Sequence, residues 1–164
     1  MANITAYYLE RFASSETNLR RVMTRRIRRE LKTEDGIDDA RLSDARVWLD
    51  EIIADLKRQK LIDDRTYAMG RAARDRRLGK APARTRAKLI AKGVARDLAA
   101  EATADDGSAE WAAAIALASR RRLGPYREKP RDADTDRRDL AAFARGGISY
   151  AVAKRLMALD EPPA

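Results

Sequence analysis

The chain has 164 residues, a formal net charge of +9 and neither cysteine nor histidine. Without those residue types it has no disulfide, thiol nucleophile or imidazole base, and carboxylates are the only side chains left for a metal ion. We therefore expect a protein that is not an enzyme and that has no cofactor or metal. The positive charge indicates either an acidic partner such as nucleic acid or a solvated basic surface that keeps the protein soluble.

The composition also favours helices. The chain is rich in alanine and in charged residues, and no long alternating apolar pattern appears anywhere in it. No apolar stretch approaches the length of a membrane span, and residues 1–10 lack the basic flank and apolar run of a signal peptide. We expect an all-α, cytoplasmic protein without a membrane partner.

Two helices are predicted before residue 32. The first spans residues 4–13 and presents an aromatic surface that includes Tyr7 and Phe12. Ser14 or Ser15 is placed to cap the second helix, because a short side-chain oxygen can accept from the free N–H groups of a first turn. That helix has apolar residues on one side and arginines on the other, among them Arg20, Arg21, Arg25 and Arg28.

An acidic segment and a long helix follow. Residues 32–44 have no clear period and are predicted to form an exposed loop, whereas residues 43–60 form a helix whose apolar side includes Trp48. Residues 33–55 contain eight acidic residues against two arginines. This acidic helix could therefore lie beside the arginine-bearing one, which is an alternative to a partner surface.

The stretch from Leu61 to Val94 contains two short helices joined by a Gly-Lys-Ala-Pro turn. Asp63 or Asp64 is placed to cap the first of them. Pro82 is tolerated in the first turn of the second, where a missing N–H costs no hydrogen bond. Gly93 can end that helix in a left-handed conformation.

The same stretch has a large local excess of positive charge. Between Arg65 and Arg96 there are eleven basic residues against one acidic residue, Asp75, so the local excess of ten is larger than the net charge of +9. Arg84, Lys88 and Lys92 recur at four-residue steps and share one side of the second helix. Such a localised charge is typical of a docking surface.

The last part of the chain repeats this pattern. A short helix at residues 95–104 ends at Asp105 and Asp106, and Ser108 is placed to cap a helix that contains Trp111. The sequence Arg-Arg-Leu-Gly at residues 76–79 recurs 45 residues later, and Gly93-Val94 recurs as Gly147-Ile148 after 54 residues. Recurrence at such a period indicates stacked helical units.

We therefore predict an all-α tandem array of three three-helix repeats that forms an elongated, curved monomer. The repeats are residues 1–61, which are enlarged, residues 62–107, and residues 108–164. The last repeat carries a loop insertion at residues 124–135 and a short tail.

Several motifs resemble those of the RecX family, which are modulators of the RecA recombinase. The middle repeat is similar in its order of Leu-Ile-Asp-Asp, an aromatic-Ala pair, arginines, Gly-Lys and a closing Leu-x-x-x-Gly-Val. GISYAVAKRLM and YYLERFASS resemble the closing helix of the third repeat and the opening helix of the family. The chain departs from the family at Lys60, where glycine is more usual, and in its longer first repeat.

This resemblance implies a DNA-repair regulator that lies in the groove of a RecA filament on single-stranded DNA and obstructs its extension, recombination and coupled ATP hydrolysis. The alternatives are a nucleic-acid-binding protein that contacts phosphates of single- or double-stranded DNA, a helix-turn-helix regulator, and a helical adaptor anchored by Trp48 and Trp111. Apolar neighbours at helical spacing favour core positions for both tryptophans. The predicted partner-binding residues are Arg71, Arg74, Arg77, Lys80, Arg84, Lys88 and Lys92, with Arg20, Arg21, Arg25 and Arg28 as a second group.

Paired carboxylates are the remaining candidates for chemistry. Asp63-Asp64 precedes a helix and is predicted to cap it, and the acidic pairs at residues 38–39 and 105–106 are predicted to be solvated loop residues. Gly79-Lys80 lacks the glycine spacing and the hydroxyl residue of a phosphate-binding loop. No catalytic residue is predicted.

Overall fold

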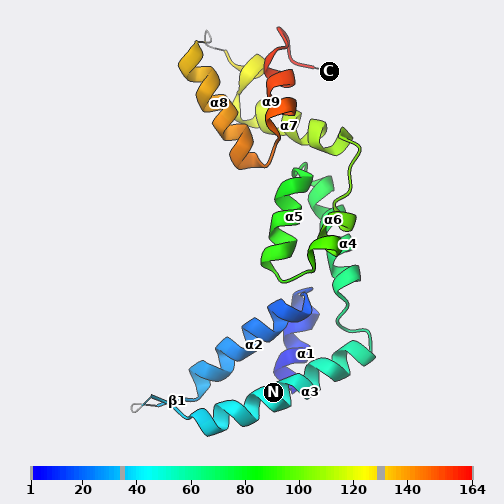
Figure 1. The fold of residues 1–164 in the computed structure, drawn as a ribbon, viewed down its shortest axis with the longest axis vertical. Coiled ribbons are helices and arrows are strands. Elements are labelled where there is room, and N and C mark those ends of the chain that lie inside the picture. The colour runs from blue at the N-terminus through cyan, green and yellow to red at the C-terminus, as the bar shows by residue number, and fades with distance from the viewer. Residues whose placement is uncertain (1, 34–35, 129–131, 164) are drawn as a thin grey trace. The chain divides into compact units, whose positions relative to one another are not determined.

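A computed structural model describes residues 2–33, 36–128 and 132–163. Most of these residues are helical, which confirms the predicted all-α class (Figure 1). In the described residues the strands are confined to a short antiparallel hairpin, in which Lys32 pairs with Ile37. The elements in chain order are α1 (Ala2–Arg11), α2 (Glu16–Glu30), β1 (Lys32–Thr33), β2 (Gly36–Ile37), α3 (Asp39–Arg58), α4 (Asp64–Arg77), α5 (Pro82–Ala91), α6 (Arg96–Ala102), α7 (Ser108–Arg121), the 3-10 turn η1 (Gly124–Tyr126), α8 (Ala133–Gly146) and α9 (Tyr150–Met157).

The chain divides into two compact units. The first contains residues 1–68 and 89–98, and the second contains residues 69–88 and 99–164. The boundary passes through α4, α5 and α6, so the middle of the chain contributes to both units. The division into three repeats and their arrangement as a curved array stay predictions.

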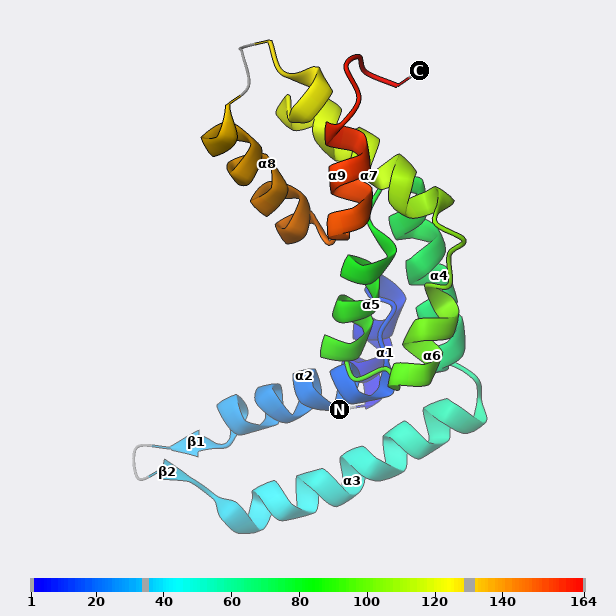
Figure 2. The same ribbon diagram turned by 45° about the horizontal axis from the view of Figure 1, so that its top comes forward.

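The core of the first unit lies between α2 and α3, which run side by side in both ribbon views (Figures 1 and 2). Leu19, Met23 and Ile27 of α2 meet Leu49 and Ile53 of α3. These residues recur at four-residue steps, so each helix turns one apolar stripe towards the other. The amphipathic character predicted for both helices is therefore confirmed.

The predicted loop at residues 32–44 is wrong in its second half. Helix α3 begins at Asp39, four residues before the expected position, because the side chain of Asp38 accepts a hydrogen bond from the backbone N–H of Arg41 at 3.0 Å. Asp38 is thus an N-cap and not a solvated loop residue.

The predicted core position of Trp48 is also wrong. Its side chain is 40% exposed, whereas Leu42, Leu49 and Ile53 of the same helix are buried. Apolar residues occupy more than one side of α3, and α2 covers the side that contains Leu49. Trp48 is therefore left near the outer side.

The start of α2 is tied to the segment that follows α5 within the first unit. Ser15 caps α2 by accepting from the N–H of Asn18, as predicted, and its hydroxyl donates to the carbonyl of Lys92. Gly93 has a φ of +83°, and a Cβ built on it would lie 2.3 Å from the Cβ of Thr17. Only glycine fits this junction, both for its conformation and for its space.

The second unit has its core among α7, α8 and α9, which are shown in yellow-green, orange and red in Figure 2. Phe143 and Leu156 are completely buried there. Trp111 packs against this core but is only half-buried, with the guanidinium of Arg155 at 4.6 Å from its ring centre. Buried Asp139 accepts from the N–H of Gly124 at 2.8 Å and so fixes η1 against α8.

A second glycine junction occurs in this unit. Gly147 ends α8 with a φ of +84°, and its added Cβ would lie 3.0 Å from the Cβ of Arg84 near the start of α5. Gly93 and Gly147 thus have the same backbone conformation and contact the first turn of an earlier helix in the same way. The recurrence seen in the sequence corresponds to a recurring junction.

The predicted cap of α7 is wrong. Ser108 is the first helical residue, and Gly107 occupies the N-cap position without a side chain. The carboxylate of Asp105 accepts from the N–H groups of Ala109 and Glu110, each at 3.0 Å, and Asp106 accepts from Ser108. The acidic pair therefore caps the helix from farther upstream and is not simply solvated.

Candidate interaction surface

Two of the predicted contact residues of the middle stretch, Arg71 and Lys80, bind one buried carboxylate. Asp75 is 1% exposed and lies on α4. Its oxygens accept from Lys80 Nζ at 2.7 Å, Arg71 Nε at 3.4 Å and the Thr85 hydroxyl at 3.3 Å. A buried charge needs such partners, and these connect α4 to the turn and to α5.

The electrostatics of this network favour the charged form of Asp75. Burial alone would raise the pKa of Asp75, but the hydrogen bond from Lys80 and the charges of Arg71 and Lys80 outweigh it and lower the pKa below its ordinary value. The positive charges of Arg71 and Lys80 are therefore partly neutralised inside the molecule by Asp75. They stay in the predicted contact set, with less positive potential to offer a partner.

Three other arginines of the set carry no internal counterion. Arg74 and Arg77 lie in the last turn of α4 and Arg84 in α5; all are exposed, and none forms an ion pair with another described residue. Lys88 is half-buried, and its pKa is lowered by burial and by the neighbouring charges of Arg84 and Lys80. The geometry thus leaves a concentration of uncompensated positive charge on these two helices.

Lys92 has a different environment from Arg84. Its ammonium group donates to the Asn18 side-chain oxygen at 3.0 Å, and its carbonyl accepts from Ser15. Lys92 is therefore a member of the glycine junction in the first unit as well as a predicted contact residue. A substitution there would disturb the junction together with any interface.

The second group of predicted contact residues also contains both internally bonded and unpaired arginines. Arg20 pairs with Asp50 of α3 and lies 3.7 Å from Glu16, so the alternative of attraction between the two helices is realised at this residue. Arg21 donates to the carbonyl of Ala91 at 3.1 Å. Arg25 and Arg28 are exposed and unpaired within the described ranges.

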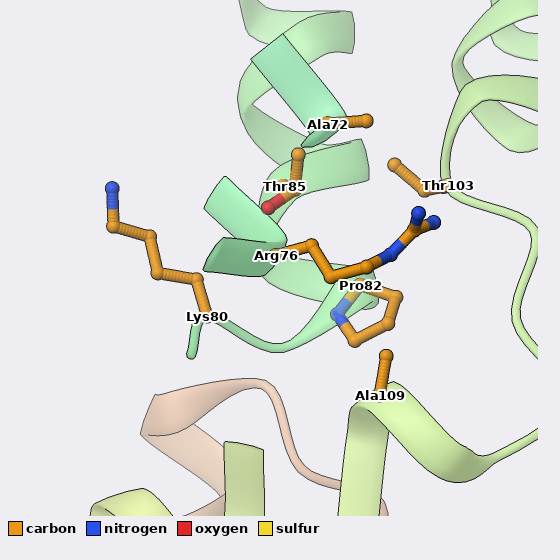
Figure 3. A pocket seen from close by; sticks show the side chains of 7 residues that line it. All are labelled: Ala72, Arg76, Lys80, Pro82, Thr85, Thr103 and Ala109. Atoms are coloured by element: carbon orange, nitrogen blue, oxygen red, sulfur yellow. The ribbon is translucent and has the colours of Figure 1, made fainter. Parts of the chain in front are cut away.

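A small pocket, lined by residues of the second unit, lies between α4, α5 and the start of α7 (Figure 3). Arg76 extends across it towards Thr103, and Lys80 lies on the opposite side. Its buried hydroxyl groups are already bonded, because Thr85 donates to Asp75 and Thr103 accepts from Arg86 Nε at 3.0 Å. The pocket therefore presents no free nucleophile or base.

The carboxylate pairs prove to be structural in the residues described. Asp63 caps α4 as predicted, accepting from the N–H groups of Thr66 at 3.2 Å and Arg65 at 2.8 Å, and these bonds lower its pKa. Asp64 instead accepts from the N–H of Glu16 at 2.8 Å and so joins the start of α4 to the start of α2. Across the described ranges, no group of three or more acidic residues is arranged to hold a metal ion.

Two features of the structure, one in each unit, were missed from the sequence. The neutralising role of Asp75 has a signal, because it is the only acidic residue of the basic stretch and lies four residues after Arg71. The exposure of Trp48 has no local signal, because it depends on which side of α3 is covered by α2.

Among the described helices, none is long and apolar enough to cross a bilayer.

Comparison with known proteins gives two matches and two negative results. The regulatory protein RecX of Myxococcus xanthus is 36% identical over 168 residues, which cover 100% of this chain and 86% of that protein. The regulatory protein RecX of Agrobacterium fabrum is 34% identical over 100 residues, which cover 61% of this chain and 53% of that protein. No family model matches the chain. No solved structure matches it either.

Proposed function

Because this chain belongs to the RecX family of regulatory proteins, we propose that it binds the RecA recombinase filament and inhibits recombination and ATP hydrolysis by that filament. The observation that carries this proposal is 36% identity along the whole chain to a regulatory protein RecX. In this proposal the protein acts in the cytoplasm as a monomer, has no catalytic residue and needs no cofactor.

The unpaired arginines supply the physical basis for the contact. Arg74, Arg77 and Arg84 keep their full positive potential, since no carboxylate in the described residues pairs with them. A filament on single-stranded DNA offers phosphates, and charge attraction steers association and weakens as salt is added. We assign the primary contact to these three residues and Lys88, with Arg25 and Arg28 as a further group. Arg71, Lys80, Lys92, Arg20 and Arg21 would contribute less because of their internal bonds.

Charge reversal tests this assignment. The variant Arg74→Glu/Arg77→Glu/Arg84→Glu should raise the concentration needed for half-inhibition of RecA strand exchange by about tenfold or more, which corresponds to about 1.4 kcal/mol. Helicity by circular dichroism should be unchanged, because all three side chains are exposed.

The matched control places the same charge change elsewhere. Arg121, Arg138 and Arg145 are also exposed arginines without a described ion pair, so Arg121→Glu/Arg138→Glu/Arg145→Glu alters the net charge equally. This control should inhibit like the natural sequence. Equal inhibition by all three proteins would remove the arginines of α4 and α5 from the mechanism.

A second candidate function is sequence-independent binding to nucleic acid. The same unpaired arginines favour it, because phosphate contacts need no base-edge readers and the basic stretch from Arg65 to Arg96 contains neither Asn nor Gln. A gel-shift comparison of unrelated duplexes and single strands tests it. Equal affinity for unrelated duplexes supports this candidate, whereas preference for one sequence supports a helix-turn-helix regulator.

A further inference from the structure

Helix α3 presents an exposed apolar face on the side away from α2. Val47 is 60% exposed and Trp48 is 40% exposed, and Ala40 and Ala54 are exposed one to two turns before and after them. Large apolar side chains exposed together on a regular helix are uncommon unless a partner covers them. Tryptophan in particular is enriched among residues that dominate binding energy at protein interfaces.

Two carboxylates flank this apolar face. Asp44 lies one turn before Val47 and Trp48, and Glu51 lies one turn after them. Both are exposed and neither pairs with a cation in the part of the chain that is described. They are seven residues apart, which is roughly 10 Å along a helix axis.

Two other acidic residues of α3 are paired internally, since Asp50 bonds Arg20 of α2 and Asp55 lies 2.9 Å from Arg58. In a chain with a net charge of +9, two carboxylates without an internal counterion attract an external one.

Charge complementarity indicates what covers the face. Asp44 and Glu51 would repel the phosphates of a nucleic acid. The apolar side chains between these two carboxylates would gain nothing from contact with phosphates. A protein segment with one apolar side chain between two basic ones fits the apolar face and both of its flanking carboxylates. A basic side chain can also lie over the Trp48 ring.

We infer that the outer face of α3, formed by Asp44, Val47, Trp48 and Glu51, docks a basic segment of a partner protein. This inference rests on the proposed function and deepens it, because the segment then belongs to RecA itself. The α3 face contacts protein, and the arginines of α4 and α5 contact the phosphates.

The experiment compares binding to two immobilised targets, which are poly(dT) alone and RecA filaments assembled on poly(dT) with a non-hydrolysable ATP analogue. Trp48→Ala should weaken binding to the filaments by about 10- to 30-fold, as expected for a central interface residue, and leave binding to poly(dT) unchanged. Tyr150→Ala is the matched control, because Tyr150 is an aromatic residue that is 65% exposed on α9. It should alter neither affinity.

A second variant guards against an effect of Trp48→Ala on folding. Asp44→Lys/Glu51→Lys changes only exposed, unpaired side chains, so it should keep the fold while it weakens filament binding and strengthens binding to poly(dT). Filament affinity that is unchanged in both variants would overturn the inference and leave the proposed function intact.

Two further outcomes identify other failures. If the natural sequence binds filaments no more tightly than poly(dT), the proposed function fails and the inference fails with it. If sedimentation shows a dimer that Trp48→Ala dissociates, a second copy covers the face and the assignment to RecA is wrong. The chain could supply such a contact through exposed Leu78 beside Arg74 and Arg77.

Discussion

Lys60 adopts a left-handed backbone conformation, with a φ of +56°, directly after α3. Its N–H donates to the carbonyl of Lys57 at 3.0 Å, and the N–H of Leu61 donates back to Leu56 at 2.9 Å, which closes the helix in the way that usually requires glycine. This backbone conformation favours glycine, which is the residue that the family resemblance implies at this position.

Lys60→Gly should therefore raise the free energy of unfolding by about 1 kcal/mol. Relief of the left-handed conformation contributes about 1–2 kcal/mol. Part of this gain is lost because glycine gives the unfolded chain more conformational freedom. Urea denaturation measures the change. Lys60→Ala is the control, because it removes the side chain but keeps the strain. A gain that is the same in both variants would show that the lysine side chain, and not its φ, is responsible.

The buried carboxylate of Asp75 makes stability depend on pH. Its pKa is lower in the folded protein than in the unfolded chain, where an aspartate has a pKa of about 3.9. Its stabilisation is thus fully present above that unfolded value and is lost as the pH falls through the lower folded value. Asp75→Asn should flatten the fall in unfolding free energy as the pH drops below about 4, again measured by urea denaturation. An unchanged slope would show that Asp75 does not contribute to acid unfolding.

At the scale of elements, the glycine junctions should be the positions least tolerant of substitution. Gly93→Ala has to accommodate both a φ of +83° and a Cβ 2.3 Å from Thr17, so it should destabilise by about 2–5 kcal/mol. Gly107→Ala is the matched control, because Gly107 has a φ of +96° but nothing within 4 Å of its added Cβ. It should cost only the conformational part, about 1–2 kcal/mol. Equal losses in thermal denaturation would show that the close approach to Thr17 is unimportant.

Helix ends were predictable from the sequence because capping is local. Ser15 and Asp63 cap the helices that they were expected to cap, and Pro82 begins α5. Each depends on a few neighbouring residues. The predicted start of α3 was wrong because Asp38 lies in an acidic run that has no apolar periodicity.

Side-chain surroundings were less predictable because they depend on residues distant in sequence. Asp50 pairs with Arg20 across 30 positions, and Lys92 reaches Asn18 across 74 positions. No spacing rule indicates such pairs. For the same reason the sequence predicted the concentration of basic residues correctly. It could not distinguish Arg84, which has no internal ion pair, from basic residues whose charge is neutralised internally.

At the scale of the whole molecule, the chain is a helical protein of the RecX family in which one stretch has a net excess of ten positive charges, against +9 for the whole chain. Buried Asp75 compensates part of that charge, and exposed arginines of α4 and α5 keep the rest. In our proposal this remaining charge faces the nucleic acid of a RecA filament, and the acidic apolar face of α3 meets the protein. The two surfaces together would favour a filament over either component alone.

The central claim is regulation of RecA, and the most direct measurement is steady-state ATP hydrolysis by RecA on single-stranded DNA, titrated with this protein. We predict that hydrolysis falls by at least half at well below one copy per RecA, because a protein bound along the filament obstructs its extension for many subunits. Hydrolysis that stays constant up to one copy per RecA, with the protein shown to be folded by circular dichroism, would contradict the account.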